Sequence, residues 1–171
     1  HDGRIYVCDT RLAAIVVLDL EGREFDLWSP VDDGQLREPV NCAVDPADGR
    51  LFVTDTGRGE IVVFGPDRRF LGAFAGGEGA RPVDVSVDDS LAWVADFGRS
   101  SVAAYDRRDF TPVRTLPADP ADSAAALYGP MSVWAGPEAV YVSDFGAFHV
   151  QVYARDGTWL RTVGQLGRTP G

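Results

Sequence analysis

Residues 139–153 read AVYVSDFGAFHVQVY, in which a short apolar strand ends on Asp144 and a second apolar run opens at Val150. A phrase of the same form occurs three more times in the chain. The four copies are IYVCDT at residues 5–10, LFVTDT at 51–56, AWVADF at 92–97 and VYVSDF at 140–145. Successive copies lie about 40–50 residues apart, a period typical of proteins built from repeated supersecondary units. This repeat decides the fold.

Each phrase belongs to a larger unit. Six residues after its aspartate a second strand opens with a β-branched residue, namely Ile15, Ile61, Val102 or Val150. A polar turn and a third strand follow. Three copies are also preceded by a proline-led segment, which reads PVNCAVD at 39–45, PVDVSVD at 82–88 and PMSVWAG at 130–136. A complete unit is therefore four short strands joined by turns rich in Gly, Asp and Pro, with no helical periodicity. Such units predict an all-β protein of the β-propeller class, each unit forming one blade.

The repeat also predicts the domain organisation. We expect one propeller segment over residues 1–171, with complete blades at 39–77, 82–117 and 130–164 and an incomplete blade at 1–29 that lacks its proline-led strand. Propellers typically need about four to eight blades. We therefore expect the remaining blades to come from a longer chain or from a self-associating copy. An irregular four-bladed ring is the alternative.

Composition restricts the partners. The chain has 171 residues, of which 45% are hydrophobic, and a formal net charge of −10. This excess of acidic residues argues against nucleic acid as a binding partner, because proteins bind the phosphate backbone through clustered basic residues. No apolar stretch is long enough to span a membrane. The cell compartment is left open by these features.

Recognisable catalytic motifs are missing from the sequence. It contains no G-x-S-x-G elbow and no phosphate-binding loop, and with only His1 and His149 a histidine-bound metal site cannot be built. Cys8 and Cys42 each lie in an apolar strand pattern, where a free cysteine behaves as a small hydrophobe. A disulfide between them stays open, although their spacing gives it no support, and a two-cysteine metal site lacks partners.

The repeated aspartates have a structural interpretation. Aspartate at the end of a strand is well placed to accept hydrogen bonds from the backbone N–H groups of the following turn. We expect this role for Asp9, Asp55, Asp96 and Asp144, and for Asp45 and Asp88 at the ends of two proline-led segments. A catalytic acid is not usually needed in every blade.

Three polar residues occupy one repeated position in the proline-led segments: Asn41, Asp84 and Ser132. This strand is expected next to the propeller axis. Carboxylate and amide oxygens suit a hard cation such as calcium, so Asn41 and Asp84 are candidate metal ligands. The alternative, which a single charge among the three favours, is a role in binding ordered water or in pairing strands. No other cofactor is expected.

A second set of residues is expected on one face of the propeller. The turns after the repeated phrase and the connections between blades should emerge together there. That face would carry Arg11, Arg37, Arg58, Arg81, Arg99, Phe97, Tyr128, Phe145, Phe148 and His149. Arginine and aromatic residues are enriched at binding hot spots. The alternative is that the arginines pair with the abundant acids and the phenylalanines cover blade edges. His149 is expected as a loop or strand-edge residue and not as a base. The connection over residues 117–130 is unusually long, and such connections are more often functional or mobile than idle.

The joint recurrence of the proline, the YVxD phrase and the β-branched strand resembles the NHL-repeat family over almost the entire chain. That resemblance implies a six-bladed ring. It also implies an extracytoplasmic location, periplasmic or on the surface, because bacterial NHL proteins are often exported. Two family positions differ here. The Asn after the phrase is replaced by Leu12, Arg58, Arg99 and Ala147, and the Arg before the next strand by Ala14, Glu60, Ser101 and His149. These departures weaken any inference about a ligand from the family.

Three functions follow from these observations. A non-catalytic scaffold that binds a protein, peptide or glycan through the loop face agrees best with the missing catalytic groups. A metal-dependent enzyme of the lactonase or lyase kind is the alternative, since six-bladed relatives of this fold include such enzymes. RNA binding, suggested by the NHL domains of animal tripartite-motif proteins, agrees least with the acidic composition.

Overall fold

The computed structural model describes residues 3–19, 21 and 25–164. These residues form fifteen strands and one short 3-10 turn, η1 (Asp32–Gly34), and contain no α-helix. Within the same part of the chain there is accordingly no helix with the length and apolar character needed to cross a bilayer. The prediction of an all-β fold is confirmed.

The strands form four separate antiparallel sheets in chain order. The first sheet contains β1 (Arg4–Asp9), β2 (Ala14–Asp19) and β3 (Phe25–Trp28). The second contains β4 (Pro39–Val44), β5 (Leu51–Asp55), β6 (Glu60–Phe64) and β7 (Phe70–Phe74). The third contains β8 (Pro82–Val87), β9 (Leu91–Asp96), β10 (Ser101–Asp106) and β11 (Pro112–Leu116). The fourth contains β12 (Pro130–Ala135), β13 (Ala139–Asp144), β14 (His149–Ala154) and β15 (Trp159–Val163). Each sheet is one blade.

Strand pairing repeats from blade to blade. In each four-stranded sheet the leading proline pairs with the aspartate that ends the YVxD phrase, as Pro39 does with Asp55, and the register shifts just after it. Proline has no N–H to give to the ladder, so it is accepted at the first position of a strand and beside an irregularity. A second shift separates Val63 from Phe64, and equivalent shifts occur in the other two four-stranded blades. The sequence repeat is thus also a repeat of hydrogen-bond pattern.

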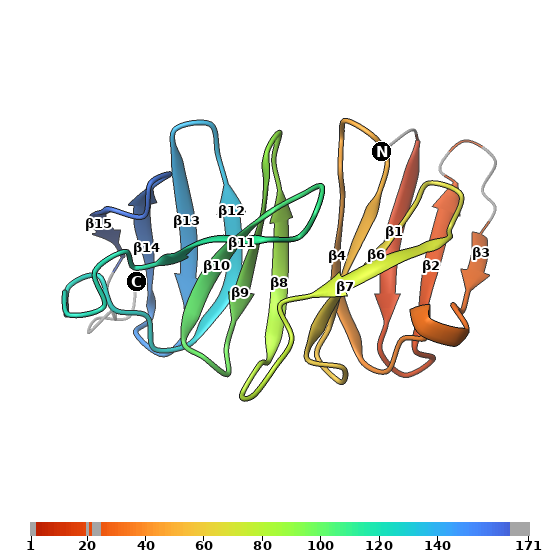
Figure 1. The fold of residues 1–171 in the computed structure, drawn as a ribbon, viewed down its shortest axis with the longest axis horizontal. Coiled ribbons are helices and arrows are strands. Elements are labelled where there is room, and N and C mark those ends of the chain that lie inside the picture. Colours follow the sequence, from red (N-terminus) through yellow and green to blue (C-terminus); the bar gives the residue numbers. More distant parts are fainter. Residues whose placement is uncertain (1–2, 20, 22–24, 165–171) are drawn as a thin grey trace, which may run out of the picture.

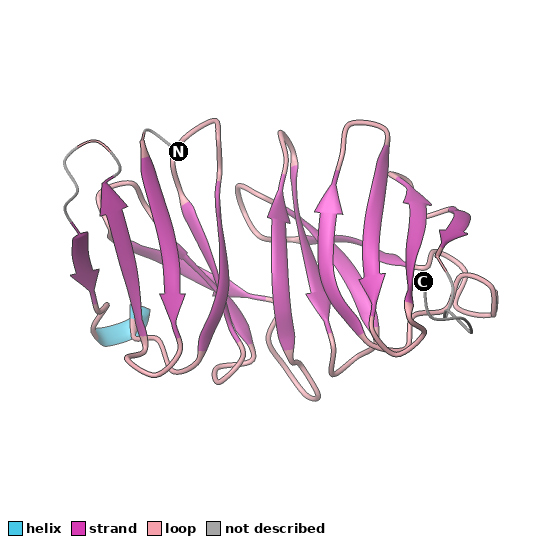
Figure 2. Ribbon diagram, turned by 180° about the vertical axis from the view of Figure 1, so that it is seen from behind, coloured by secondary structure: helices cyan, strands magenta, loops and turns pink. Residues whose placement is uncertain are grey.

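The blades follow one another in a row, with the first blade at one end and the fourth at the other (Figures 1 and 2). Among their first strands, β8 packs on β4 and on β12. Three hydrophobic clusters fill the three interfaces between neighbouring blades. Within β5, Val53 packs toward the first blade and Phe52 toward the third. All five residues of β5 are buried because both faces of the blade are covered, which explains why such strands are apolar without alternation.

The outward faces of the first and last blades have no neighbour in the described chain. Ile5 and Val7 in β1 are 43% and 44% exposed, whereas the equivalent Leu51 and Val53 in β5 are 3% and 0% exposed. At the other end, Trp134 and Phe148 are 59% and 56% exposed. We call these surfaces the first open face (Ile5, Val7, Phe25, Leu27) and the last open face (Met131, Trp134, Phe145, Phe148, Val163).

Candidate functional site

The turns that follow β1, β5, β9 and β13 open on one side of the molecule, at the bottom of Figure 1. We call this side the loop face. In the second blade it is organised by Asp55, whose Oδ1 accepts hydrogen bonds from the N–H groups of Glu38 (2.9 Å) and Arg58 (3.0 Å) and whose Oδ2 accepts one from Arg37 N–H (2.7 Å). One buried carboxylate therefore ties the turn after β5 to the connection that precedes β4.

The third and fourth blades repeat this arrangement. Asp96 accepts hydrogen bonds from Arg81 N–H (2.9 Å) and Arg99 N–H (3.1 Å), and Asp144 from Tyr128 N–H (2.8 Å) and Gly146 N–H (3.1 Å). In the three-stranded first blade, Asp9 accepts a hydrogen bond from Leu12 N–H (2.9 Å) in its own turn. The backbone of the loop face is thus fixed by the same acceptor in each blade.

Arg58, a predicted binding residue, turns its side chain into the protein. Its Nη1 donates to the carbonyl oxygens of Asp33 and Gln35, both at 2.9 Å, and its Nε and Nη2 pair with Glu60 Oε2 at 3.0 and 2.9 Å. The side chain therefore clamps the connection that carries η1 onto the second blade.

Arg99 makes the equivalent clamp in the third blade. Its guanidinium donates to the carbonyl oxygens of Ala75 (3.1 Å), Gly76 (3.0 Å) and Glu78 (3.3 Å), and it pairs with Asp96 (3.4 Å). Both arginines stand three residues after a repeated aspartate. Arginine at this repeat position therefore makes the same kind of clamp in both blades.

The fourth blade has Ala147 at that position and holds its connection differently. Gln151 Nε2 donates to Ala124 O (2.9 Å), and the Tyr153 hydroxyl donates to Ala125 O. Ala125 and Leu127 are buried in the cluster between the third and fourth blades. The long connection over residues 117–130 is therefore packed into the core over part of its length.

Three arginines of the loop face remain exposed and without a carboxylate partner. In the described part of the chain the guanidinium groups of Arg11 and Arg37 make no hydrogen bond or ion pair, and Arg81 packs over the ring of Phe97 at 5.1 Å from its centroid. Beside Arg37 lies a polar cleft of about 390 Å³. It is lined by Asp32, Asp33, Gln35, Arg37, Arg58 and Glu60. These arginines and this cleft form the candidate binding site.

The aromatic residues predicted for the loop face are divided between two surfaces. Tyr128 is exposed on the loop face, whereas Phe145 and Phe148, with ring centroids 5.8 Å apart, line a cleft at the edge of the last open face together with His149. Phe145 occupies the repeat position of Phe97, which is half-buried against the following blade. The repeat position of Phe145 is therefore one at which a blade contacts its neighbour.

The polar residues predicted for the axis lie together. Asp84 is 5% exposed, and its Oδ1 accepts hydrogen bonds from the Asn41 amide and from Val85 N–H (2.9 Å). Its Oδ2 accepts hydrogen bonds from the Ser132 hydroxyl (2.7 Å) and from Val133 N–H (2.8 Å). Burial raises the pKa of Asp84, while these four hydrogen bonds oppose the rise. This carboxylate joins the second, third and fourth blades.

A calcium site at the axis would need further oxygen ligands beside Asn41 and Asp84. Among the residues that the structure describes, no group of three or more His, Cys, Asp or Glu side chains is arranged to hold a metal ion. Both oxygens of Asp84 are engaged by protein donors.

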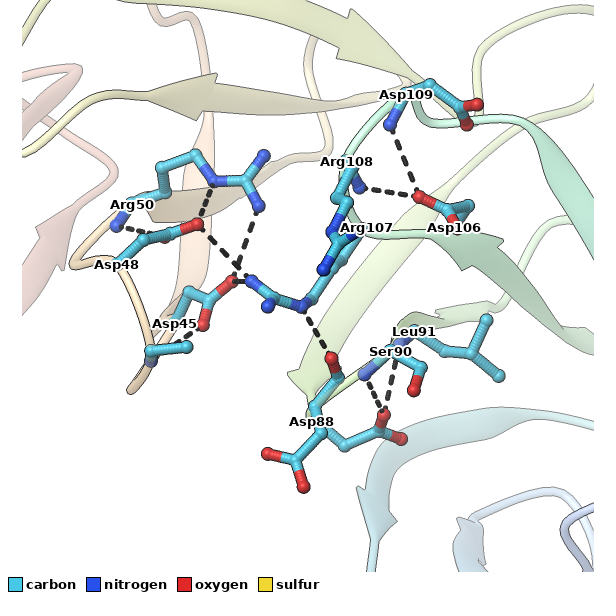
Figure 3. A network of polar contacts seen from close by, with 12 residues as sticks. Asp45, Asp48, Arg50, Asp88, Ser90, Leu91, Asp106, Arg107, Arg108 and Asp109 are labelled. Atoms are coloured by element: carbon cyan, nitrogen blue, oxygen red, sulfur yellow. Dashed lines mark hydrogen bonds and ion pairs between the residues drawn. The ribbon is translucent and has the colours of Figure 1, made fainter.

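The opposite rim carries ion pairs between blades that the sequence did not reveal (Figure 3). Arg107 of the third blade pairs with Asp45 and Asp48 of the second, and its Nε donates to Asp89 O at 2.8 Å. Arg155 of the fourth blade pairs in the same way with Asp88 of the third. Asp45 and Asp88 also accept turn N–H groups, from Ala47 and from Ser90 and Leu91. Each of these aspartates therefore fastens a turn and holds the next blade.

Proteins of known structure are similar to this chain in their fold. No family model and no curated protein matches the chain. A solved structure described as a nidogen/laminin complex matches with a TM-score of 0.71 and 21% identity, over 94% of this chain and 59% of that chain. A streptogramin B lyase matches with a TM-score of 0.71 and 13% identity, over 94% and 51% of the two chains. The hydrazine synthase of Kuenenia stuttgartiensis matches with a TM-score of 0.61 and 16% identity, over 72% and 35%.

The chain thus spans 59% or less of the length of each of these chains. At identities of 21% and below, the likeness shows the fold alone. The blades seen here and the likeness to these structures agree that the chain adopts a β-propeller fold.

Proposed function

We infer that this chain is part of an NHL-type propeller, six-bladed when complete, that acts as a non-catalytic scaffold and binds a protein segment through its loop face. The observation that supports this most directly is the set of exposed arginines, Arg11, Arg37 and Arg81. The backbone of Arg37 and of Arg81 donates to the buried aspartates Asp55 and Asp96, and the turn that carries Arg11 is held by the half-buried Asp9. A rigid surface loses little conformational entropy on binding. Arginine is also enriched among the residues that dominate binding energy.

The chemistry of the surface indicates the kind of segment it would accept. Arg37 borders a cleft that also contains Asp32 and Asp33, so a partner with a carboxylate for the arginine and a donor for the aspartates would be complementary. Bidentate pairing of arginine with a carboxylate gives such a contact directional specificity. A chain of similar fold occurs in the solved structure described as a nidogen/laminin complex, which supports protein binding as the function of this propeller.

The test is a binding screen of the complete protein against arrays of extracellular proteins, acidic peptides and glycans. For each ligand found, the affinity of an Arg37→Glu, Arg81→Glu variant is compared with that of Arg108→Glu, an exposed arginine on the opposite rim. We expect the loop-face variant to lose about tenfold or more in affinity, which corresponds to about 1.4 kcal/mol, and the control to lose none. Equal affinity of both variants would remove the loop face as the site. Binding confined to glycans would change the class of ligand.

A lyase-like or lactonase-like enzyme is the second candidate, and one observation favours it. The Nε2 atom of His149 is buried and has no hydrogen-bond partner in the described chain, and His149 lines the cleft with Phe145 and Phe148. An imidazole nitrogen can donate or accept a hydrogen bond, and the described residues supply no partner for this one. Elemental analysis of the intact protein and turnover of a lactone panel, with a His149→Gln variant, test this reading. Lack of turnover with no bound metal would count against it. Salt-dependent RNA binding would instead favour the third candidate.

A further inference from the structure

Cys8 and Cys42 occupy repeat positions whose residues share one hydrophobic cluster at two of the described interfaces between blades. Cys8 is the fourth residue of its repeated phrase and Cys42 the fourth residue of its proline-led segment. The repeat position of Cys8 is occupied in the other blades by Thr54, Ala95 and Ser143. The repeat position of Cys42 is occupied in the other blades by Val85 and Val133. Ala95 and Val133 lie in one cluster between the third and fourth blades. At the interface between the first and second blades, both of these positions carry a cysteine.

The two cysteines lie together at this interface. Strand β1 lies beside β4 (Figure 1), and both cysteines pack half-buried against the same hydrophobic cluster. The Cys42 thiol donates a hydrogen bond at 3.7 Å to the carbonyl oxygen of Tyr6, which precedes Cys8 by two residues in β1, and each thiol shifts the pKa of the other. Both cysteines are free thiols in this structure. The pair is thus placed between two blades with partial access to solvent.

We propose that Cys8 and Cys42 form a reversible disulfide that joins the first blade to the second, with a small-molecule disulfide such as oxidised glutathione as the oxidant. The strands that carry the two cysteines, β1 and β4, pack against each other across this interface. The bond would be added to the existing contact between the Thr10 hydroxyl and the Pro39 carbonyl oxygen (2.7 Å) across the same interface.

The interaction between the two thiols favours Cys42 as the first thiolate. The Cys8 thiol lowers the pKa of Cys42, although burial opposes this. The Cys42 thiol, then burial and the nearby charge of Asp55, raise the pKa of Cys8. The thiolate is the attacking species in exchange with disulfides, so Cys42 attacks first.

The exchange takes place in two steps. The Cys42 thiolate attacks one sulfur of the glutathione disulfide, whose S–S bond breaks and releases one glutathione thiolate. Cys8 then loses its proton and attacks the Cys42 sulfur of the mixed disulfide, which releases the second glutathione thiolate. Two protein thiols are oxidised by two electrons, one glutathione disulfide is reduced, and the two protons pass to the released thiolates.

The experiment incubates the native protein with oxidised glutathione and measures free thiols, intact mass and a non-reducing peptide map. Two variants use residues that other blades carry at the same positions, Cys8→Ser as in Ser143 and Cys42→Val as in Val85. The unchanged protein should lose both thiols and gain a Cys8–Cys42 peptide link. Cys8→Ser should stop at a glutathione adduct on Cys42, and Cys42→Val should react more slowly than Cys8→Ser.

A stability readout separates the proposal from mere thiol reactivity. The melting temperature of the oxidised protein should exceed that of the reduced protein, and the addition of a reductant should reverse the gain. The same treatment should produce no gain in either variant. Thiols that react only after unfolding, adducts that never resolve to the internal link, or disulfides formed only between molecules would each overturn the proposal.

Discussion

Asp84 is a buried carboxylate whose two oxygens receive donors from three blades. A buried charge is tolerated only when its hydrogen-bonding capacity is used, because the loss of water must be compensated. Burial still raises the pKa of Asp84, so the ionised form is held at some cost. The residue therefore serves less to add stability as a charge than to fix how the inner strands β4, β8 and β12 meet.

Replacement of Asp84 should be more damaging than replacement of a surface aspartate. Asp84→Ala leaves the N–H groups of Val85 and Val133 and the Ser132 hydroxyl without their acceptor, and unsatisfied buried groups cost about 1–3 kcal/mol each. Because water can enter from the axis, we expect a total loss of about 2–4 kcal/mol in the free energy of unfolding. Chemical denaturation measures it. The control, Asp89→Ala, removes an exposed carboxylate in the turn between β8 and β9 and should change stability by less than about 0.5 kcal/mol. Equal effects of both variants would contradict this role.

At the scale of single residues, the repeat identifies positions but not partners. Equivalent positions meet equivalent neighbours, so the repeated aspartates and the polar axial position could be singled out from the sequence. The guanidinium of Arg58 could not be assigned in this way, since its acceptors are carbonyl oxygens of residues 33 and 35, which no pattern of side chains reveals. The same holds for Arg107, whose partner Asp45 lies in another blade.

At the scale of elements, Arg58 shows how a connection is held to its blade. We expect Arg58→Ala to release the segment over residues 32–38, because the carbonyl oxygens of Asp33 and Gln35 lose their donor. Hydrogen exchange should become faster there by about tenfold, which corresponds to the loss of about 1.4 kcal/mol of local stability. Arg37→Ala is the matched control, since its guanidinium makes no bond in the described chain. Equal exchange in both variants would show that Arg58 does not clamp this connection.

The ion pair between Asp88 and Arg155 predicts a dependence of stability on pH. Burial raises the pKa of Asp88, but hydrogen bonds from Arg155, Ser90, Leu91 and Trp93 outweigh this, so the pKa lies below its usual value. A carboxyl with a lowered folded-state pKa contributes stability above its unfolded pKa of about 3.9, and that contribution is lost as pH falls through the folded pKa.

Asp88→Asn should therefore be less stable than the unchanged protein by roughly 1–2 kcal/mol near neutral pH, and the difference should shrink as the pH is lowered below about 4. Urea denaturation at several pH values measures the difference. Arg155→Leu should show the same trend without full convergence, because Arg155 also donates to the Gly136 carbonyl oxygen (2.8 Å). The double variant should lose less stability than the sum of the two single losses, because the ion pair is lost in all three. A difference that stays constant with pH would contradict the assignment.

The strands were predictable because each blade repeats the same apolar pattern, and Phe52 and Val53 are buried on opposite faces of one strand as a blade between two others requires. The path of the connection over residues 117–130 was not predictable, because Gln151 and Tyr153 hold it through hydrogen bonds to the carbonyl oxygens of alanines. Those bonds depend on a fold of the connection that its composition does not encode.

At the scale of the whole molecule, the two open faces are the two halves of one kind of interface. Ile5 and Val7 stand at the positions of Leu51 and Val53, which pack against the preceding blade. Phe145 stands at the position of Phe97, which contacts the following blade. The first open face therefore suits the last open face of another copy, as well as any further blade. Contiguous exposed apolar residues of this kind favour association.

We expect the 171-residue chain alone to associate head to tail. Such a contact joins two different surfaces, so a charge on either one should suffice to break it. Val7→Asp and Phe148→Asp should each shift the sedimentation profile toward the monomer and weaken self-association by about tenfold or more, because each buries a charge in an apolar contact. Val113→Asp, an exposed apolar position on the outer strand β11, is the control and should leave association unchanged. Mixing the Val7→Asp and Phe148→Asp chains should restore one intact interface and yield dimers, which separates a head-to-tail contact from a symmetric one. A chain that sediments as a monomer at all concentrations, or variants that weaken association no more than the control, would show that these faces do not bind each other.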